Sequence, residues 1–126
     1  MEKKLILCDT NIIIEFYKGN QVFVEKLRKI GLDNIVISSI TLAELVFGAL
    51  NKMELNTILK DSKALRLISI NETVSHIFLE LMTEYSLSHR LSIPDALIAS
   101  TAIVNDLELF TLNLKDFRFI KGLRLY

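Results

Sequence analysis

Three acidic residues stand alone in long uncharged windows of the sequence. Asp9 is the single charge between positions 5 and 14, Glu44 between positions 34 and 51, and Asp95 between positions 91 and 105. Charged residues make up 24% of the chain, so windows of this length ordinarily hold several. A buried carboxylate is costly unless it is paired, protonated or bound to a metal. No Lys, Arg or His lies in these windows, so the pattern indicates a metal site.

Oxygen ligands without a Cys or His cluster favour Mg²⁺ or Mn²⁺ over zinc. Such an ion commonly keeps several waters and takes one or two carboxylates directly. One of those waters can be activated to attack a phosphodiester, so the expected chemistry is metal-dependent hydrolysis. The sequence leaves open whether one ion or two would bind.

Each acid also has a purely structural interpretation. Asp9 can cap a helix. Glu44 completes the pattern Thr41-x-x-Glu44, which is typical of a capping box. Asp95 follows Pro94 and can complement the dipole at a helix start. All three would then have to fall by coincidence in uncharged windows at one edge of one sheet, so a shared metal site is the favoured interpretation.

Short apolar runs alternate with helical patterns along the chain. The predicted strands cover residues 5–8, 35–37, 67–70, 108–111 and 123–126. The predicted helices cover residues 11–17, 21–30, 41–51 and 54–63, a long helix that Asn71 caps and that carries an apolar stripe to Tyr85, and 94–105. This alternation predicts parallel strands joined by right-handed crossovers, and therefore a three-layer α/β/α sandwich.

The predicted fold explains how distant acids would meet. In open α/β sheets, ligands bind outside the carboxyl ends of the strands. Asp9 ends the first strand, whereas Glu44 and Asp95 are expected in the first turns of their helices. We therefore expect all three at the same edge of the sheet.

Bulk properties limit the possible functions. A length of 126 residues fits one domain spanning 1–126. The formal net charge is zero, so any affinity for RNA must come from local positive charge or from bound metal. Cys8 is the single cysteine, which predicts no internal disulfide and a cytoplasmic location. The apolar run after Met1–Lys4 is too short for a signal peptide or a membrane span.

Four segments, in this order, resemble the PIN domain family, and in particular the VapC-type toxins of bacterial and archaeal toxin–antitoxin pairs. The first is Leu-Cys-Asp-Thr-Asn at 7–11, and the second is Ile-Ser-Ser-Ile-Thr-Leu-Ala-Glu-Leu at 37–45. The third is Ile-Pro-Asp-Ala-Leu-Ile-Ala at 93–99, and the fourth is Leu-Phe-Thr-Leu-Asn-Leu-Lys-Asp-Phe at 109–117. Each segment alone is weakly specific, but the four in this order and at this spacing are a strong signal, and the resemblance extends over nearly the whole chain.

The resemblance implies a fold and an activity. The fold would be a parallel sheet of about five strands in the order 3-2-1-4-5, with helices on both faces. The activity would be that of a metal-dependent endoribonuclease that leaves 5′-phosphate and 3′-hydroxyl ends. Its implied partners are an RNA substrate, a cognate antitoxin and a second copy of the chain, without a membrane.

The resemblance also assigns roles by position. Asp9, Glu44 and Asp95 match the family's acidic metal ligands and catalytic residues. Asn113 stands where PIN domains often carry Asp, and an acid follows at Asp116, so the identity of the fourth site position stays open. The alternative for Asp116 is a solvated turn residue.

Polar neighbours of these acids are implied to hold them in place. Thr10, Asn11 and Thr111 match such supporting groups. Asn113 would ligate through its carbonyl oxygen or orient a water. These four residues add no negative charge to the site.

Local positive charge marks the candidate RNA contacts, which are Arg90, Lys115 and Arg118. Near the end of the chain Lys115, Arg118, Lys121 and Arg124 oppose only Asp116, and a solvated face is the alternative interpretation. His89 precedes Arg90 and could also contact phosphate. His76 falls off the apolar stripe of its helix, which predicts a surface position.

Three further interpretations concern a dimer face and two rival functions. Phe47 and Leu50, within the helices of residues 41–63, could form a dimer face, and core packing explains them equally well. A non-catalytic PIN-fold domain would use the acids only structurally. A phosphoacceptor domain needs paired acids after the first strand, where only Asp9 stands.

Overall fold

A computed structural model describes residues 4–126 of the protein. Most of the Met1–Lys4 segment lies outside the described residues. Within residues 4–126 no helix is both long and apolar enough to cross a membrane.

Five parallel strands form the sheet at the centre of the molecule. They are β1 (Ile6–Cys8), β2 (Ile35–Ser38), β3 (Arg66–Ile68), β4 (Glu108–Phe110) and β5 (Arg124–Leu125). Their order is β3-β2-β1-β4-β5, and every neighbouring pair is parallel. The predicted sheet order is confirmed, with β1 in the central position.

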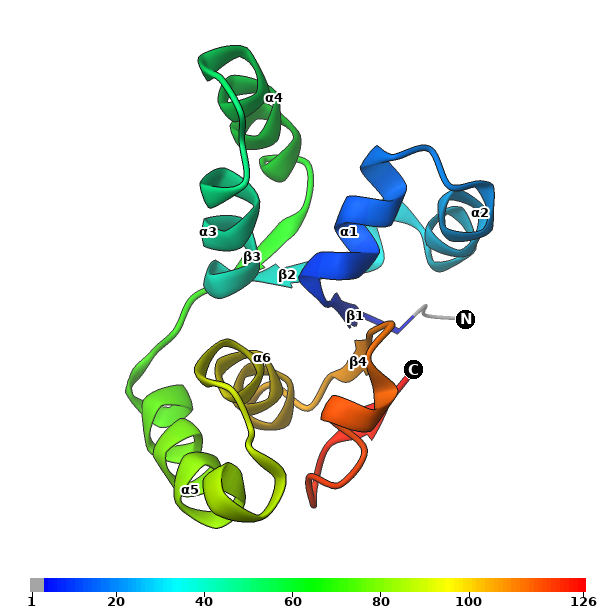
Figure 1. Ribbon diagram of the computed structural model, residues 1–126. Helices are drawn as coiled ribbons and strands as arrows, with labels where there is room; N and C mark the ends of the chain where they lie inside the picture. Colours follow the sequence, from blue (N-terminus) through cyan, green and yellow to red (C-terminus); the bar gives the residue numbers. More distant parts are fainter. Residues whose placement is uncertain (1–3) are drawn as a thin grey trace.

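Helices cover both faces of this sheet (Figure 1). They are α1 (Thr10–Tyr17), α2 (Gln21–Ile30), α3 (Ser39–Phe47), α4 (Lys52–Ser62), α5 (Glu72–His89) and α6 (Ile93–Val104), with short 3₁₀ turns η1 (Leu32–Asn34) and η2 (Leu114–Asp116). Figure 1 shows α1 and α2 on one face and α5 and α6 on the other, so the three-layer prediction is confirmed.

The central strand shows why both faces must be covered. Ile6, Leu7 and Cys8 are all buried, and successive side chains of a strand point to opposite faces. Leu7 belongs to the core cluster beneath α5 and α6, whereas Ile6 and Cys8 belong to the cluster beneath α1 and α2. A continuous apolar run is typical of such a doubly covered parallel strand.

The predicted helix at 41–51 is wrong at both ends. Ser38 caps α3, and its Oγ accepts a hydrogen bond from the Thr41 backbone N–H at 3.2 Å. The helix ends at Phe47, and Asn51 caps α4 by accepting from the Glu54 backbone N–H at 2.9 Å. The helix is therefore interrupted between Phe47 and Asn51, because the cap at Asn51 begins a second helix.

Local capping explains the other helices well. Asn71 caps α5 as predicted, accepting from the Val74 backbone N–H at 2.9 Å. The apolar stripe of α5 faces the core, where Val74, Leu81 and Tyr85 are buried. Pro94 lies in the first turn of α6, a position that tolerates its missing N–H.

Two leucines test where the stability of the fold resides. Leu109 is 0% exposed in the middle of β4, whereas Leu87 on α5 is 96% exposed. Leu109→Ala should lower the free energy of unfolding by about 2–5 kcal/mol, through lost burial and a residual cavity. Leu87→Ala should change it by less than about 0.5 kcal/mol. Urea denaturation measures both, and equal losses would contradict the described core.

Candidate active site

Asp9 lies at the carboxyl end of the central strand, directly before α1. The residue is 5% exposed, and both oxygens of its carboxylate accept hydrogen bonds. Oδ1 accepts from the Thr10 backbone N–H at 2.8 Å, and Oδ2 accepts from the Thr111 hydroxyl at 2.7 Å. The predicted cap is therefore real, and it occupies one oxygen of the side chain.

The pairing of β1 with β4 brings Thr111 to Asp9. Cys8 is in register with Phe110, and the Asp9 backbone N–H donates to the Phe110 carbonyl at 2.9 Å. Asp9 and Thr111, the residues that follow β1 and β4, therefore lie side by side. Thr111 also accepts from the Asn113 backbone N–H at 3.0 Å, which orders the segment that follows β4.

Glu44 lies in the middle of α3, half-buried, and not in the first turn as predicted. Its Oε1 accepts from the Thr10 hydroxyl at 2.7 Å. The predicted capping box of Thr41 with Glu44 is wrong, because Ser38 is the cap and Glu44 points to α1. Thr10 therefore joins the two acids, through its backbone N–H to Asp9 and its hydroxyl to Glu44.

Two buried hydroxyls, on residues that no sequence motif assigned to this role, support this link. Thr41 Oγ1 lies 3.1 Å from Thr10 Oγ1, and Ser38 Oγ lies 3.4 Å from Thr41 Oγ1. Both residues are 0% exposed. The pattern Ser38-x-x-Thr41 is the signal for the Ser38 cap in the sequence, and the pattern Thr41-x-x-Glu44 competes with it.

Asp95 lies half-buried in the first turn of α6. The Ser92 side chain caps this helix by accepting from the Asp95 backbone N–H at 3.2 Å. Burial is the largest cause that raises the pKa of Asp95 to about 6, followed by the charge of Asp9. A hydrogen bond with Ser92 lowers this pKa, and the charges of Asp116 and Glu44 raise it further.

The pKa of Asp9 is also raised, and burial is again the largest cause. Hydrogen bonds from Thr111 and Thr10 lower it, and the charges of Glu44 and Asp116 raise it. The structure thus brings Asp9, Glu44, Asp95 and Asp116 close enough for their negative charges to act on one another. This is the arrangement that a cation would relieve.

The fourth position combines two residues of different character. Asp116 is half-buried in η2, so its charge is not confined to a fully solvated turn. Asn113 is exposed, and its side chain makes no capping hydrogen bond to η2. Asn11 accepts from the Leu112 backbone N–H at 3.4 Å and so joins α1 to the same segment.

The ligand chemistry of this edge is that of oxygen. Cys8 adjoins Asp9 in the chain, but burial and the charge of Asp9 raise the pKa of its thiol to about 12. It therefore remains a neutral core residue. Among residues 4–126, no three Asp, Glu, His or Cys side chains are grouped closely enough to hold a metal ion by themselves.

The basic candidates lie at the surface. Arg90, Lys115, Arg118 and Lys121 are exposed, and within residues 4–126 none of them forms an ion pair. Arg124 pairs with Asp106 at 2.7 Å, so the prediction that it belongs to an unopposed basic patch is wrong. The surface position of His76 is confirmed by its 72% exposed side chain.

Comparison with known proteins now gives the family. A family model described as PIN domain matches residues 6–122. The chain belongs to the PIN domain family. This PIN domain is 30% identical to ribonuclease VapC10 of Mycobacterium tuberculosis over 122 residues. The aligned region covers 95% of this chain and 91% of that protein.

Solved structures show the same likeness. A toxin–antitoxin complex from Klebsiella pneumoniae matches with a TM-score of 0.80 and 31% identity, over 94% of both chains. VapBC2 from Rickettsia felis, solved bound to a DNA fragment from its promoter, matches with a TM-score of 0.82 and 32% identity, over 97% of both chains. The PIN domain is therefore a homologue of VapC-type ribonuclease toxins.

The raised pKa of Asp95 predicts a pH dependence of stability without metal. The folded protein binds this proton more tightly than the unfolded chain, so the contribution of Asp95 to stability is fully present below about pH 4 and is lost as pH rises through about 6. Asp95→Asn should therefore raise the melting temperature in chelator at pH 7 and leave it nearly unchanged at pH 4. Thermal scans at both values measure this. Asp33→Asn, on an exposed residue, is the matched control, and the same gain at both pH values would contradict the cluster.

Proposed function

We propose that this PIN domain is a metal-dependent endoribonuclease, the toxin of a toxin–antitoxin module, that uses Mg²⁺ or Mn²⁺. One observation carries the proposal: acids from four separate segments lie near the edge where the strands end, and the charges of Glu44 and Asp116 raise the pKa values of Asp9 and Asp95. Membership of the family and likeness to ribonuclease VapC10 support the same activity.

The donor set fits a hard divalent ion. Asp9, Glu44 and Asp95 would hold it, with Asp116 or the Asn113 carbonyl at the fourth position. Mg²⁺ usually takes one or two carboxylates directly and completes its shell with water, so it does not require three of these acids to contact it at once. When bound, the ion lowers the pKa of a water and stabilises charge on the leaving oxygen.

The chain's own residues keep the acids charged and oriented. The Thr111 hydroxyl donates to Asp9 and lowers its pKa, which opposes the effect of burial. The Thr10 hydroxyl donates to Glu44 and fixes its direction. Without a cation the acids repel an RNA phosphate, so the proposed cleavage requires the metal.

The proposed partners follow from the neighbours and from two apolar surfaces. The Klebsiella and Rickettsia structures are toxin–antitoxin complexes, and an apolar groove of about 600 Å³ between α1, α2 and the end of α4 suits an antitoxin segment.

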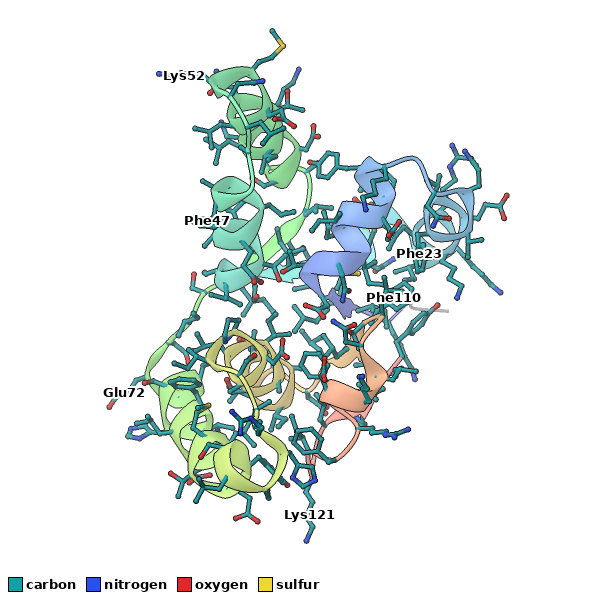
Figure 2. All side chains as sticks on the ribbon, viewed as in Figure 1. Phe23, Phe47, Lys52, Glu72, Phe110 and Lys121 are labelled. Carbon is teal, nitrogen blue, oxygen red and sulfur yellow. The ribbon has the colours of Figure 1, made fainter. Side chains whose placement is uncertain are left out.

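A second apolar surface suits a homodimer. Phe47, Leu50 and Met53 are 93%, 88% and 79% exposed, so core packing does not explain them. Figure 2 labels Phe47 on α3, and we propose this corner as the face of a homodimer. A cytoplasmic location is part of the same proposal.

One observation favours a second function. Both oxygens of Asp9 already accept hydrogen bonds within the protein, as a structural acid would. A non-catalytic PIN-fold interaction domain is therefore the alternative. Measurement of metal-dependent cleavage separates the two functions.

Asp9→Asn tests the activity directly. It should abolish Mn²⁺-dependent RNA cleavage, because a ligand charge is lost, and leave the metal-free melting temperature unchanged or higher. Asparagine is as good a helix cap as aspartate, so α1 should persist. Asp33→Asn is the matched control and should cleave like the wild type, with 5′-phosphate and 3′-hydroxyl ends. Full activity of Asp9→Asn would refute the proposed site.

Substitutions at Thr10 test whether its hydroxyl orients Glu44 for metal binding. Thr10→Val removes the hydroxyl that orients Glu44, and loss of such a partner typically costs roughly 10–100-fold in metal affinity or activity. Thr10→Ser keeps the hydroxyl and should bind Mn²⁺ like the wild type. Calorimetric titration with Mn²⁺ measures both variants. Equal affinities for valine and serine would show that Thr10 has no orienting role.

A further inference from the structure

We propose that His89 and Phe119 form a stacking platform for a base of single-stranded RNA, flanked by the cations Arg90 and Arg118. This deepens the proposed ribonuclease function and rests on it. The stacking platform is the His89–Phe119 ring pair together with Tyr85, which supports both rings. It supplies affinity for unpaired nucleotides, and the acids supply the chemistry.

The two rings are held parallel before any RNA binds. Their centroids lie 4.1 Å apart with 11° between the planes. Tyr85 meets both edge-on, at 5.7 Å from His89 and 5.1 Å from Phe119. The Tyr85 hydroxyl accepts from the Lys121 backbone N–H at 3.1 Å, and Ser88 Oγ lies 2.8 Å from His89 Nδ1.

Exposure decides which ring would receive a base. Phe119 is half-buried and packs against the main core cluster, whereas His89 is exposed. One face of the imidazole covers Phe119, and because His89 is exposed, we assign its other face to the incoming base. Stacking of a base on such a ring is tolerant of sequence, because every base has a π-face.

The stacking platform lies close to the acids along the chain. His89 ends α5, and only three residues separate its C-terminus from α6, whose first turn carries Asp95. Phe119 follows Asp116 by three residues, so their Cα atoms are at most about 11 Å apart. In the proposal, an RNA strand with a phosphate at the acids places a nearby base of the same strand on the rings.

The surrounding charge suits the RNA backbone. Arg90 directly follows His89, Arg118 directly precedes Phe119, and Lys121, which Figure 2 labels, lies two residues after Phe119. All three are exposed, and no ion pair within residues 4–126 neutralises them. Arg90 has a φ of 53°, a left-handed conformation that favours glycine at the end of a helix. An arginine is thus held in a strained position where glycine would fold more easily.

Paired RNA would not use such a surface. Bases in a duplex are already stacked on their neighbours, whereas unpaired bases can be splayed onto an aromatic ring. The stacking platform therefore predicts preference for single-stranded loops and ends. It predicts little discrimination among base types.

The experiment measures RNA binding and base stacking separately from cleavage. An Asp95→Asn protein, with Mg²⁺, is titrated with a short single-stranded RNA that carries 2-aminopurine, whose fluorescence falls when it stacks. Adding His89→Ala should weaken binding about tenfold and abolish the quenching, and His89→Phe should restore both. His76→Ala, an exposed histidine on the same helix, is the matched control and should change neither.

Arg90→Gly separates a structural role from a binding role. Relief of the left-handed conformation should leave the melting temperature unchanged or higher. Loss of the cation should nevertheless weaken RNA binding. A lower melting temperature with unchanged RNA affinity would overturn the role of Arg90 in the proposal.

The outcomes distinguish this proposal from the ribonuclease proposal. Cleavage by the wild type together with normal binding and quenching in His89→Ala overturns the stacking platform alone. Binding that depends on His89, without cleavage of any RNA by the wild type, overturns the ribonuclease proposal and supports the stacking platform. Absence of RNA binding by the Asp95→Asn protein and by the wild type overturns the stacking platform.

Discussion

The hydrogen bond from Thr111 to Asp9 is the contact on which the rest of the site depends. Asp9 is 5% exposed at the end of the central strand, where burial alone would favour a neutral acid. The Thr111 hydroxyl and the Thr10 backbone N–H oppose that cost by donating to the two carboxylate oxygens. Both donors are supplied by the fold: one by the start of α1, the other by the parallel pairing of β1 with β4.

The same construction extends to the other acids. Thr10 donates to Glu44, and α6 presents Asp95 in its capped first turn. The charges of these acids and of Asp116 raise the pKa values of Asp9 and Asp95, so the metal-free protein retains a repulsion that packing does not remove. A bound cation would offset this repulsion. Such a site supports the proposed activity of a metal-dependent nuclease of the PIN domain family.

Much of the fold could be predicted because its signals are local and redundant. Continuous apolar runs at β1 and β2 and an asparagine cap before α5 identify their elements with little help from distant residues. Glu44 was misplaced because Ser38 and Thr41 are both plausible caps, and only tertiary packing of α3 against α1 decides between them. The contact of His89 with Phe119 and the pair of Arg124 with Asp106 join residues far apart in sequence, and no local pattern indicates them.

The central claim is that these carboxylates share a divalent cation at the carboxyl edge of the sheet. Anomalous diffraction from crystals of the wild-type protein grown with Mn²⁺ tests it most directly. The account predicts a manganese peak in contact with at least one of Asp9, Glu44 and Asp95, with waters completing its coordination. Crystals with millimolar Mn²⁺ that show no peak at these residues, while the four acids keep their positions, would contradict it.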